Sequence, residues 1–160
     1  MRNRSRAAIL LVTVAVGGLL AASAFATLPV GFTATILGSG DTDHAVHLDG
    51  DGVHLDSDGP VNVTTGDFRL AVGGKTGWHH HPGVVLVIVQ GGTIRETHVG
   101  PNGGCISHTY SDGDVFAEGS HRAHIARNIG TTEVSLLATF IVPTGTPSLR
   151  IDRRVPECAK

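Results

Sequence analysis

The chain has 160 residues, of which 12 are basic, 14 are acidic and 10 are histidine, so its net charge is −2 with neutral histidines. This length suggests a single domain. A weakly acidic chain is a poor partner for nucleic acid or for anionic membrane surfaces, because both attract concentrated positive charge. Neither is therefore expected as a partner, and the ten histidines are the most unusual feature of the composition.

The first 26 residues are typical of a secretory signal peptide. Three arginines precede an apolar run, and small residues then lead to cleavage after Ala24 or Ala26. An uncleaved membrane anchor is the alternative, because about 20 apolar residues can span a bilayer. Removal of residues 1–26 leaves 9 basic against 14 acidic residues, a net charge of −5. We therefore expect a secreted or cell-envelope protein, with no stable membrane insertion after cleavage.

The next segment, residues 27–59, is expected to form an N-terminal extension of strands and loops. A first strand is predicted at 33–37. Further on, His47–Gly52 is echoed by His54–Gly59, which predicts two short strand–turn units. The aspartates and glycines of this repeat also resemble a calcium loop. That match is weak because no glutamate stands at the offset that a bidentate ligand needs.

Residues 60–145 carry the remaining predicted strands and are expected to form a β-barrel. The apolar run at 84–89 reads as a buried strand. The Gly91-Gly92 turn that follows predicts a hairpin with the alternating run at 93–99. No stretch after residue 26 shows a sustained helical period, and the 22 glycines suit an all-β sandwich or barrel. Further strands are expected at 61–65, 67–72, 105–110, 115–117 and 134–142.

Two cysteines, Cys105 and Cys158, are the only ones in the chain. In an exported protein such a pair is expected to oxidise to a disulfide. The bond would tie the C-terminal tail, residues 146–160, to the middle of the domain. The closed loop of about 50 residues would contribute roughly 4 kcal/mol in the chain-entropy model.

Three consecutive histidines, His79–His81, stand just before the buried strand. Because side chains on a strand alternate between faces, His79 and His81 are predicted to face one side and His80 the other. Two imidazoles on one face can bind the same ion, since nitrogen–metal distances are only about 2.0–2.1 Å. We therefore predict His79 and His81 as metal ligands. The alternative is a polar loop whose histidines lie in water.

At this point the sequence resembles the cupins, a family of small jelly-roll barrels. The first cupin motif is Gly, five residues, His-x-His, then a Glu and a Gly. The second is Gly, five residues, Pro-x-Gly, two residues, His, three residues, Asn. The resemblance covers residues 60–145 and implies a cupin-type jelly-roll barrel with a metal held by His79, His81 and His124. Matching positions are Gly73, His79, His81 and Gly92 in the first motif, and Gly113, His124 and Asn128 in the second.

Two departures from the motifs bear on the implied site. The glutamate of the first motif would fall at Val85 or Leu86, and neither side chain can bind a metal. The proline and glycine of the second motif are replaced by Gly119 and His121. Three imidazoles suit Zn, Cu, Ni or Fe, and the missing carboxylate makes the site less suited to Mn. Candidates for a fourth ligand are His121, Glu96 and His98.

The sequence supports three functions. The favoured one is a small-ligand binding module that holds a divalent transition metal, with an unknown ligand. The predicted inner faces offer few carboxylates or lysines to act as general acid or base, which favours binding over catalysis. A metal-dependent enzyme of dioxygenase, isomerase or hydrolase type is the alternative, followed by a metal-free binding barrel. Because cupins often pair through an edge strand or a hydrophobic sheet face, the resemblance also implies a homodimer.

Overall fold

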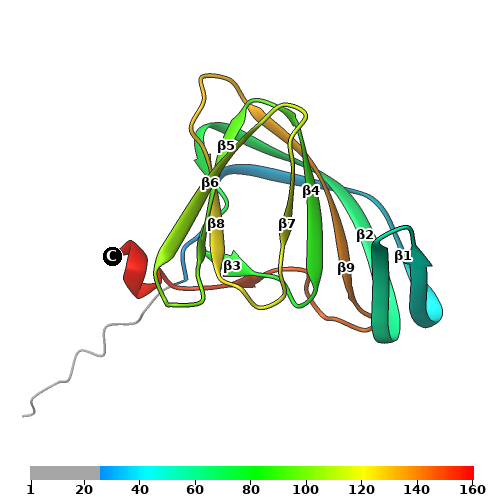
Figure 1. Ribbon diagram of the computed structural model, residues 1–160. Helices are drawn as coiled ribbons and strands as arrows, with labels where there is room; N and C mark the ends of the chain where they lie inside the picture. Colours follow the sequence, from blue (N-terminus) through cyan, green and yellow to red (C-terminus); the bar gives the residue numbers. More distant parts are fainter. Residues whose placement is uncertain (1–25) are drawn as a thin grey trace, which may run out of the picture.

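The computed structural model describes residues 26–160, whose strands form a nearly closed barrel (Figure 1). The predicted signal peptide lies outside this range, apart from its last residue. Within the described residues, no helix is long and apolar enough to cross a membrane. The elements are β1 (Val30–Gly50), β2 (Val53–Lys75), β3 (His79–His80), β4 (Val84–Gly91), β5 (Thr93–Val99), β6 (Cys105–Ser111), β7 (Val115–Glu118), β8 (His124–Asn128), β9 (Val134–Pro143), β10 (Ile151–Asp152) and a 3-10 turn at Glu157–Ala159.

The strands make two walls that share β2. One wall runs β1-β2-β9-β4-β7, and the other contains β3, β8, β5 and β6, with β10 beside β3. The walls join because β2 pairs with β9 from Val61 to Leu70 and with β8 at its last residue, Lys75, opposite Arg127. Every strand pair is antiparallel. The all-β barrel expected from the sequence is confirmed, and its form is consistent with a jelly roll.

The repeated segments form the tip of one long hairpin, so the expectation of two separate strand–turn units is wrong. In the β1–β2 register, His47 lies opposite Asp56, and Asp49 lies opposite His54. Both pairs are hydrogen-bonded through the Nδ1 atom of the histidine. Two copies of one His-x-Asp pattern meet in this way because antiparallel pairing reverses the second copy. These aspartates are paired with histidines and do not form a calcium loop.

The predicted hairpin between 84–89 and 93–99 is also wrong. Strand β4 pairs with β7 and β9, whereas β5 pairs with β6 and β8. Both edges of β4 are therefore occupied, and the chain crosses to the opposite wall at Gly92. This glycine has a φ of 81°. A side chain there would also place its Cβ 2.8 Å from the carbonyl oxygen of Glu133, so the crossing needs a glycine.

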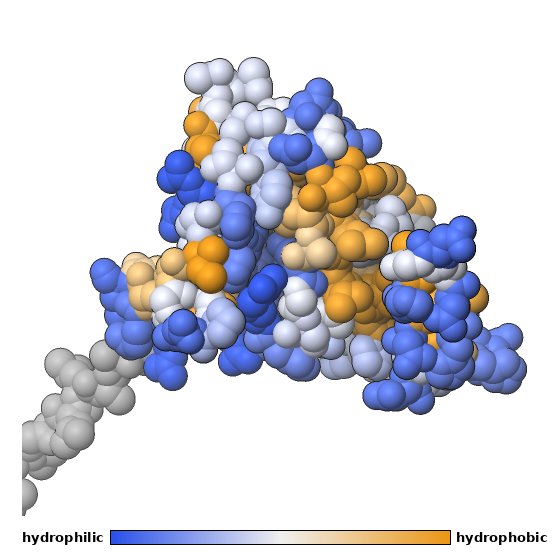
Figure 2. All heavy atoms as spheres, in the orientation of Figure 1, coloured by the Kyte–Doolittle hydropathy of each residue, from blue (hydrophilic) through white to orange (hydrophobic). Residues whose placement is uncertain are grey.

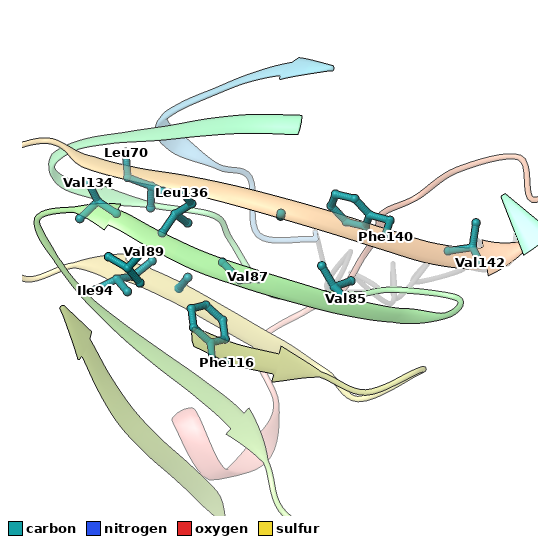
Figure 3. Close-up of a cluster of buried hydrophobic side chains, with 12 residues drawn as sticks. Leu70, Val85, Val87, Val89, Ile94, Phe116, Val134, Leu136, Phe140 and Val142 are labelled. Carbon is teal, nitrogen blue, oxygen red and sulfur yellow. The ribbon is translucent and has the colours of Figure 1, made fainter. Parts of the chain in front are cut away.

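The core lies between the two walls and extends along β4 and β9 (Figure 3). Strand β4 contributes alternate residues to it, because side chains on a strand point to opposite faces in turn. Strand β9, which pairs with β4 in the same wall, shows the same alternation of buried and more exposed residues. The buried apolar cluster comprises Leu70, Val85, Val87, Val89, Ile94, Phe116, Ala126, Val134, Leu136, Ala138, Phe140 and Val142.

The outer face of β4 is apolar as well. Val84, Leu86 and Ile88 are 44%, 49% and 41% exposed, and apolar side chains gather in this region of the surface (Figure 2). This explains the unbroken apolar run in the sequence, which a strand with one polar face would not show. A homodimer formed through this face remains a prediction.

The predicted disulfide between Cys105 and Cys158 is present, with its Cα atoms 5.4 Å apart. Cys105 begins β6, and Cys158 lies in the 3-10 turn at the end of the chain. The bond therefore anchors the C-terminal tail to the wall that contains β3 and β8.

Replacing both cysteines, Cys105→Ser with Cys158→Ser, should lower the free energy of unfolding by about 2–4 kcal/mol, because the unfolded chain gains the entropy of an open loop. Urea denaturation without reductant measures the difference. Wild-type protein unfolded in the presence of a thiol reductant is the control and should match the variant. An unchanged urea midpoint would contradict a stabilising role for the bond.

Candidate metal centre

Three histidines from two neighbouring strands meet inside the barrel. His79 and His81 come from β3 and the residue after it, and His124 begins β8, where it lies opposite His79. Their ring centroids are 4.3–5.0 Å apart, and each can offer one ligand atom so that the three atoms lie within 4.8 Å of one another. All three side chains are buried. The residues predicted from the two sequence motifs are thus brought together as one group that can hold a metal.

Backbone carbonyl oxygens fix the protonation of all three rings. The Nδ1 atoms of His79, His81 and His124 lie 2.9, 2.5 and 2.8 Å from the carbonyl oxygens of Gly77, Leu149 and Arg122 respectively. A carbonyl oxygen can only accept a hydrogen bond, so each Nδ1 carries the proton. The Nε2 atom of each neutral ring then carries a lone pair. This is the arrangement in which histidine binds metal through Nε2.

A buried carboxylate completes the group. The two carboxylate oxygens of Glu118, the last residue of β7, lie 3.2 Å from the Nε2 atoms of His81 and His124. Glu118 is 8% exposed, so water screens the charge of its carboxylate little. The one carboxylate candidate predicted from the sequence is Glu96, and Glu118 was not predicted.

The polar atoms that point into this site, the Nε2 atoms and the carboxylate oxygens, are all acceptors when the rings are neutral. Imidazole lone pairs and a carboxylate then face one another with no donor between them. His124 Nε2 is fully buried and makes no hydrogen bond of acceptable geometry within the described residues, even though Glu118 is near. Buried acceptors in this arrangement require a positive charge, supplied by protons or by a metal cation. The donor set therefore fits a metal ion.

The pKa values show the same need for positive charge. Burial by itself would raise the pKa of Glu118, but the positive charges of the nearby His124 and His81 rings outweigh it and hold the pKa below its usual range. Burial likewise disfavours a charged His124, yet the carboxylate of Glu118 raises the pKa of that ring. Burial lowers the pKa of His79 to about 2, with further lowering by the charges of His124, Arg150 and His81. His79 is therefore neutral at physiological pH and ready to act as a ligand.

The carboxylate has moved one strand across from the place that the cupin motif gives it. The motif glutamate would fall at Val85 on β4, and Val85 lies directly opposite Glu118 in the β4–β7 pair. Side chains opposite each other project from the same face about 4.5–5.5 Å apart, so either position reaches the same site. The signal was present in the sequence. Had the strand predicted at 115–117 been extended by one residue, alternation from Phe116 would have placed Glu118 inward.

The three candidates for a fourth ligand lie outside the three-histidine group. Glu96 and His98 are buried on β5 and paired with each other, with His98 Nδ1 3.0 Å from both carboxylate oxygens. His121 lies in the turn after Glu118 and has a φ of 56°, a left-handed conformation at the position where the motif has glycine. Its ring lies 5.3 Å from that of His80.

The face of β3 opposite His79 and His81 would be expected to expose His80 to water, but His80 is buried. It is 2% exposed, and its Nδ1 accepts a hydrogen bond of 2.7 Å from Arg153 Nε. The C-terminal tail covers it, because β10 pairs with β3 and places Ile151 opposite His80. Sequence alternation could separate His80 from its neighbours but could not show that the tail returns to this strand.

A cavity of about 240 Å³ lies beside the histidines. Its wall is mainly apolar and contains four of the five phenylalanines in the chain, Phe32, Phe68, Phe116 and Phe140. Its polar side chains are those of Thr76, His79, His81, Glu118 and Arg150. The arrangement can therefore bind a small molecule against the histidine group with most of its surface away from water.

The C-terminal tail supplies two parts of this site that the sequence analysis missed. The carbonyl oxygen of Leu149 accepts the bond that orients His81. The next residue, Arg150, lines the cavity, and burial lowers the pKa of its guanidinium. No sequence motif marks either residue, since their role comes from the pairing of β10 with β3.

In metal-free protein, Glu118→Gln should lower the free energy of unfolding by an amount that depends on pH. The raised pKa of His124 stabilises the fold below the unfolded value of 6.5, and this is lost as pH rises through the folded value. The lowered pKa of Glu118 stabilises it above 4.5, and this is lost as pH falls through the folded value. The wild-type advantage over the variant should therefore be larger at about pH 5.5 than at about pH 8.5, by roughly 1–3 kcal/mol.

Urea denaturation of both proteins in chelator at the two pH values checks this. Glu133→Gln is the matched control, because Glu133 is exposed and its carboxylate pairs with Arg69 rather than with a residue of the histidine group. Equal differences between wild type and Glu118→Gln at both pH values would show that Glu118 and His124 are not coupled.

Comparison with known proteins supports the fold. The family model for the cupin domain matches residues 66–140. Among solved structures, oxalate decarboxylase from Bacillus subtilis is 18% identical with a TM-score of 0.51, and the match covers 56% of this chain and 23% of that one. The Lactobacillus farciminis enzyme is 19% identical with a TM-score of 0.51, covering 56% and 26%. An oxalate oxidase is 22% identical with a TM-score of 0.46, covering 51% and 46%.

The matched region is thus less than half of each of these solved chains. The two matches with a TM-score of 0.51 show a likeness of fold alone. None of the curated proteins matches the chain. The family model, the two histidine motifs in order and the all-β barrel agree with one another. Residues 66–140 of the chain therefore match the cupin domain, and the barrel around them has a cupin-type fold.

Proposed function

We propose that this protein is an exported cupin that holds one divalent transition-metal ion through His79, His81 and His124, with Glu118 as the fourth ligand. The ion faces the apolar cavity, where a small molecule binds. The observation that carries the proposal is the convergence of buried acceptors with no donor among them. Nitrogen–metal bonds of about 2.0–2.1 Å need neighbouring ligand atoms about 3.0–3.4 Å apart, and the Glu118 contacts of 3.2 Å already fall in this range.

The carboxylate widens the choice of metal. Three imidazoles suit Zn, Cu, Ni and Fe, whereas a carboxylate ligand also suits Mn. The sequence-based argument against Mn depended on a missing carboxylate, and Glu118 removes it. A solved oxalate decarboxylase from Bacillus subtilis, 19% identical to this chain, is described by its Mn(II) centres. Manganese therefore joins zinc, copper, nickel and iron as a candidate.

The residues of the cavity favour binding over catalysis. A bound divalent ion would supply a Lewis acid that polarises an oxygen of the ligand. The chain itself orients the ligand and excludes water through the phenylalanine wall. Within the described residues, the acid–base side chains that line the cavity are His79, His81 and Glu118, all of which are proposed as metal ligands. None of them is then left to move a proton.

A metal-dependent enzyme is the second candidate, and one observation favours it. His98 lies opposite His124 in the β5–β8 register, and Glu96 holds its Nδ1. A histidine with one nitrogen fixed by a buried carboxylate is suited to proton transfer. If the protein turns over a ligand, His98→Gln should abolish turnover and keep the metal. Equal rates in the variant and wild type would remove this role.

Export is supported by two features of the chain. The arginine-led apolar leader is typical of a signal peptide, and the Cys105–Cys158 bond suits an oxidising compartment. Intact-mass measurement of protein from the culture medium or cell envelope should give a chain that begins at residue 25 or 27. A full-length mass in the membrane fraction would instead support an uncleaved anchor.

Protein purified without chelator should contain about one equivalent of a transition metal by elemental mass spectrometry. The double variant His79→Ala with His81→Ala should lose it, and Glu118→Gln should bind it about tenfold or more weakly. Affinity should fall as pH drops through the raised pKa of His124, because a ligating imidazole must be neutral.

The matched control is the double variant His47→Ala with His54→Ala. These two histidines lie on the exposed hairpin tip, with side chains 67% and 71% exposed. Their loss should leave the metal content unchanged. Unchanged metal content in the His79→Ala, His81→Ala protein would rule out the proposed site.

A further inference from the structure

We propose that the cavity beside the metal centre selects a small amphiphilic monoanion, a molecule with one anionic headgroup and an apolar body, and that Arg150 determines this specificity. The inference rests on the proposed function for the ion that faces the same cavity. It depends on Arg150, the apolar wall and the charge of the site, each of which is set by residues in the described part of the chain.

The wall defines the body of the ligand. Phe32, Phe68, Phe116 and Phe140 line the cavity together with aliphatic side chains of β1, β4 and β9. A molecule that fills this space must be apolar over most of its surface, because polar groups buried without partners are destabilising. The volume of about 240 Å³ equals that of about eight water molecules in the liquid, or roughly eight to ten non-hydrogen atoms.

Arg150 is held in place by two hydrogen bonds to groups of the chain itself. Its Nε donates to a carboxylate oxygen of Asp152 at 2.7 Å, and one Nη atom donates to the carbonyl oxygen of Thr76 at 2.6 Å. No hydrogen bond within residues 26–160 involves its other Nη atom, Nη1. The guanidinium is therefore fixed by two contacts and keeps donors for a third partner. A planar, pre-positioned fork of donors is suited to a carboxylate or a similar anion.

The charges that face the cavity favour an anion. Arg150 and Glu118 are the two charged side chains in its lining, apart from the histidines, and they cancel. A divalent ion held by the histidines would leave this apolar space with a net charge of about +2. Opposite charge on the ligand offsets the cost of this arrangement, whereas a neutral or cationic ligand does not.

The same features exclude two other classes of ligand. A small dianion such as oxalate would satisfy Arg150 but leave the phenylalanine wall uncovered. A neutral hydrocarbon would cover the wall but leave the donors of Arg150 buried without a partner, which is costly. A headgroup of one negative charge on a body of about six to eight carbons satisfies both.

Isothermal titration calorimetry with linear carboxylates tests the body and the headgroup separately. Acetate, butyrate, hexanoate, octanoate and decanoate should bind with affinity that rises about fourfold per CH₂ group and stops rising near octanoate, where the cavity is full. Hexan-1-ol should bind about tenfold or more weakly than hexanoate, because it lacks the charge. Oxalate should bind no better than acetate.

Arg150→Gln should lower the affinity for hexanoate about tenfold or more and leave hexan-1-ol within about twofold. Arg150→Lys keeps the charge without the fork and should fall between the two proteins. Ala138→Leu, which narrows the cavity from β9, should weaken hexanoate and spare acetate. The matched control is Arg154→Gln, an exposed arginine of the same tail, which should bind as wild type.

All variants are compared by thermal unfolding and metal content, and each titration is repeated after chelation. Equal affinity of the wild type for hexanoate and hexan-1-ol, or an unchanged affinity of Arg150→Gln for hexanoate, would overturn the inference. If the same protein contains a metal, the proposed function would still stand. Arg150-dependent binding of hexanoate by a protein that takes up no metal would uphold the inference and overturn the metal site. Should Arg150→Gln fail to fold, the Arg150→Lys and Ala138→Leu series decides by the same criteria.

Discussion

The carboxylate of Glu118 lies buried between the Nε2 atoms of His81 and His124, 3.2 Å from each, and the rest of the site depends on this contact. A carboxylate in such a place is stable only beside positive charge. The surrounding strands provide for that charge by turning the lone pairs of the histidines inward through bonds to carbonyl oxygens. The short turn after Glu118 is tied to the histidine segment, because the backbone N–H of His121 donates to the carbonyl oxygen of His81 at 2.8 Å.

Sequence patterns predicted the parts of the fold and site that depend on local periodicity. The grouping of His79, His81 and His124 was predicted correctly, because the position of each histidine in its motif is set by the local strand or turn and the two motifs occur in the expected order. Asn128, which matches the second motif, fixes a turn, because its side chain forms hydrogen bonds with the backbones of Leu70, Ala71, Thr132 and Gly130. These positions are set by short-range constraints that a reader of the chain can see.

The features that sequence reasoning missed come from pairing between distant segments. Glu118 reaches the site because β7 lies beside β4, and the Gly91-Gly92 turn leads to the other wall because both edges of β4 are already paired. His80 is buried because β10 returns to β3 from the far end of the chain. Alternation fixes which face a side chain takes, but strand order decides what that face meets.

The residues that could hold a metal and the arginine that lines the cavity lie in different stretches of the chain. The three histidines and Glu118 all fall within the matched region at 66–140, whereas Leu149, Arg150 and Cys158 follow it. A fragment that ended at residue 140 would keep the histidine group and lose Arg150. Substitutions in the tail can therefore alter the lining of the cavity without replacing any residue of the histidine group.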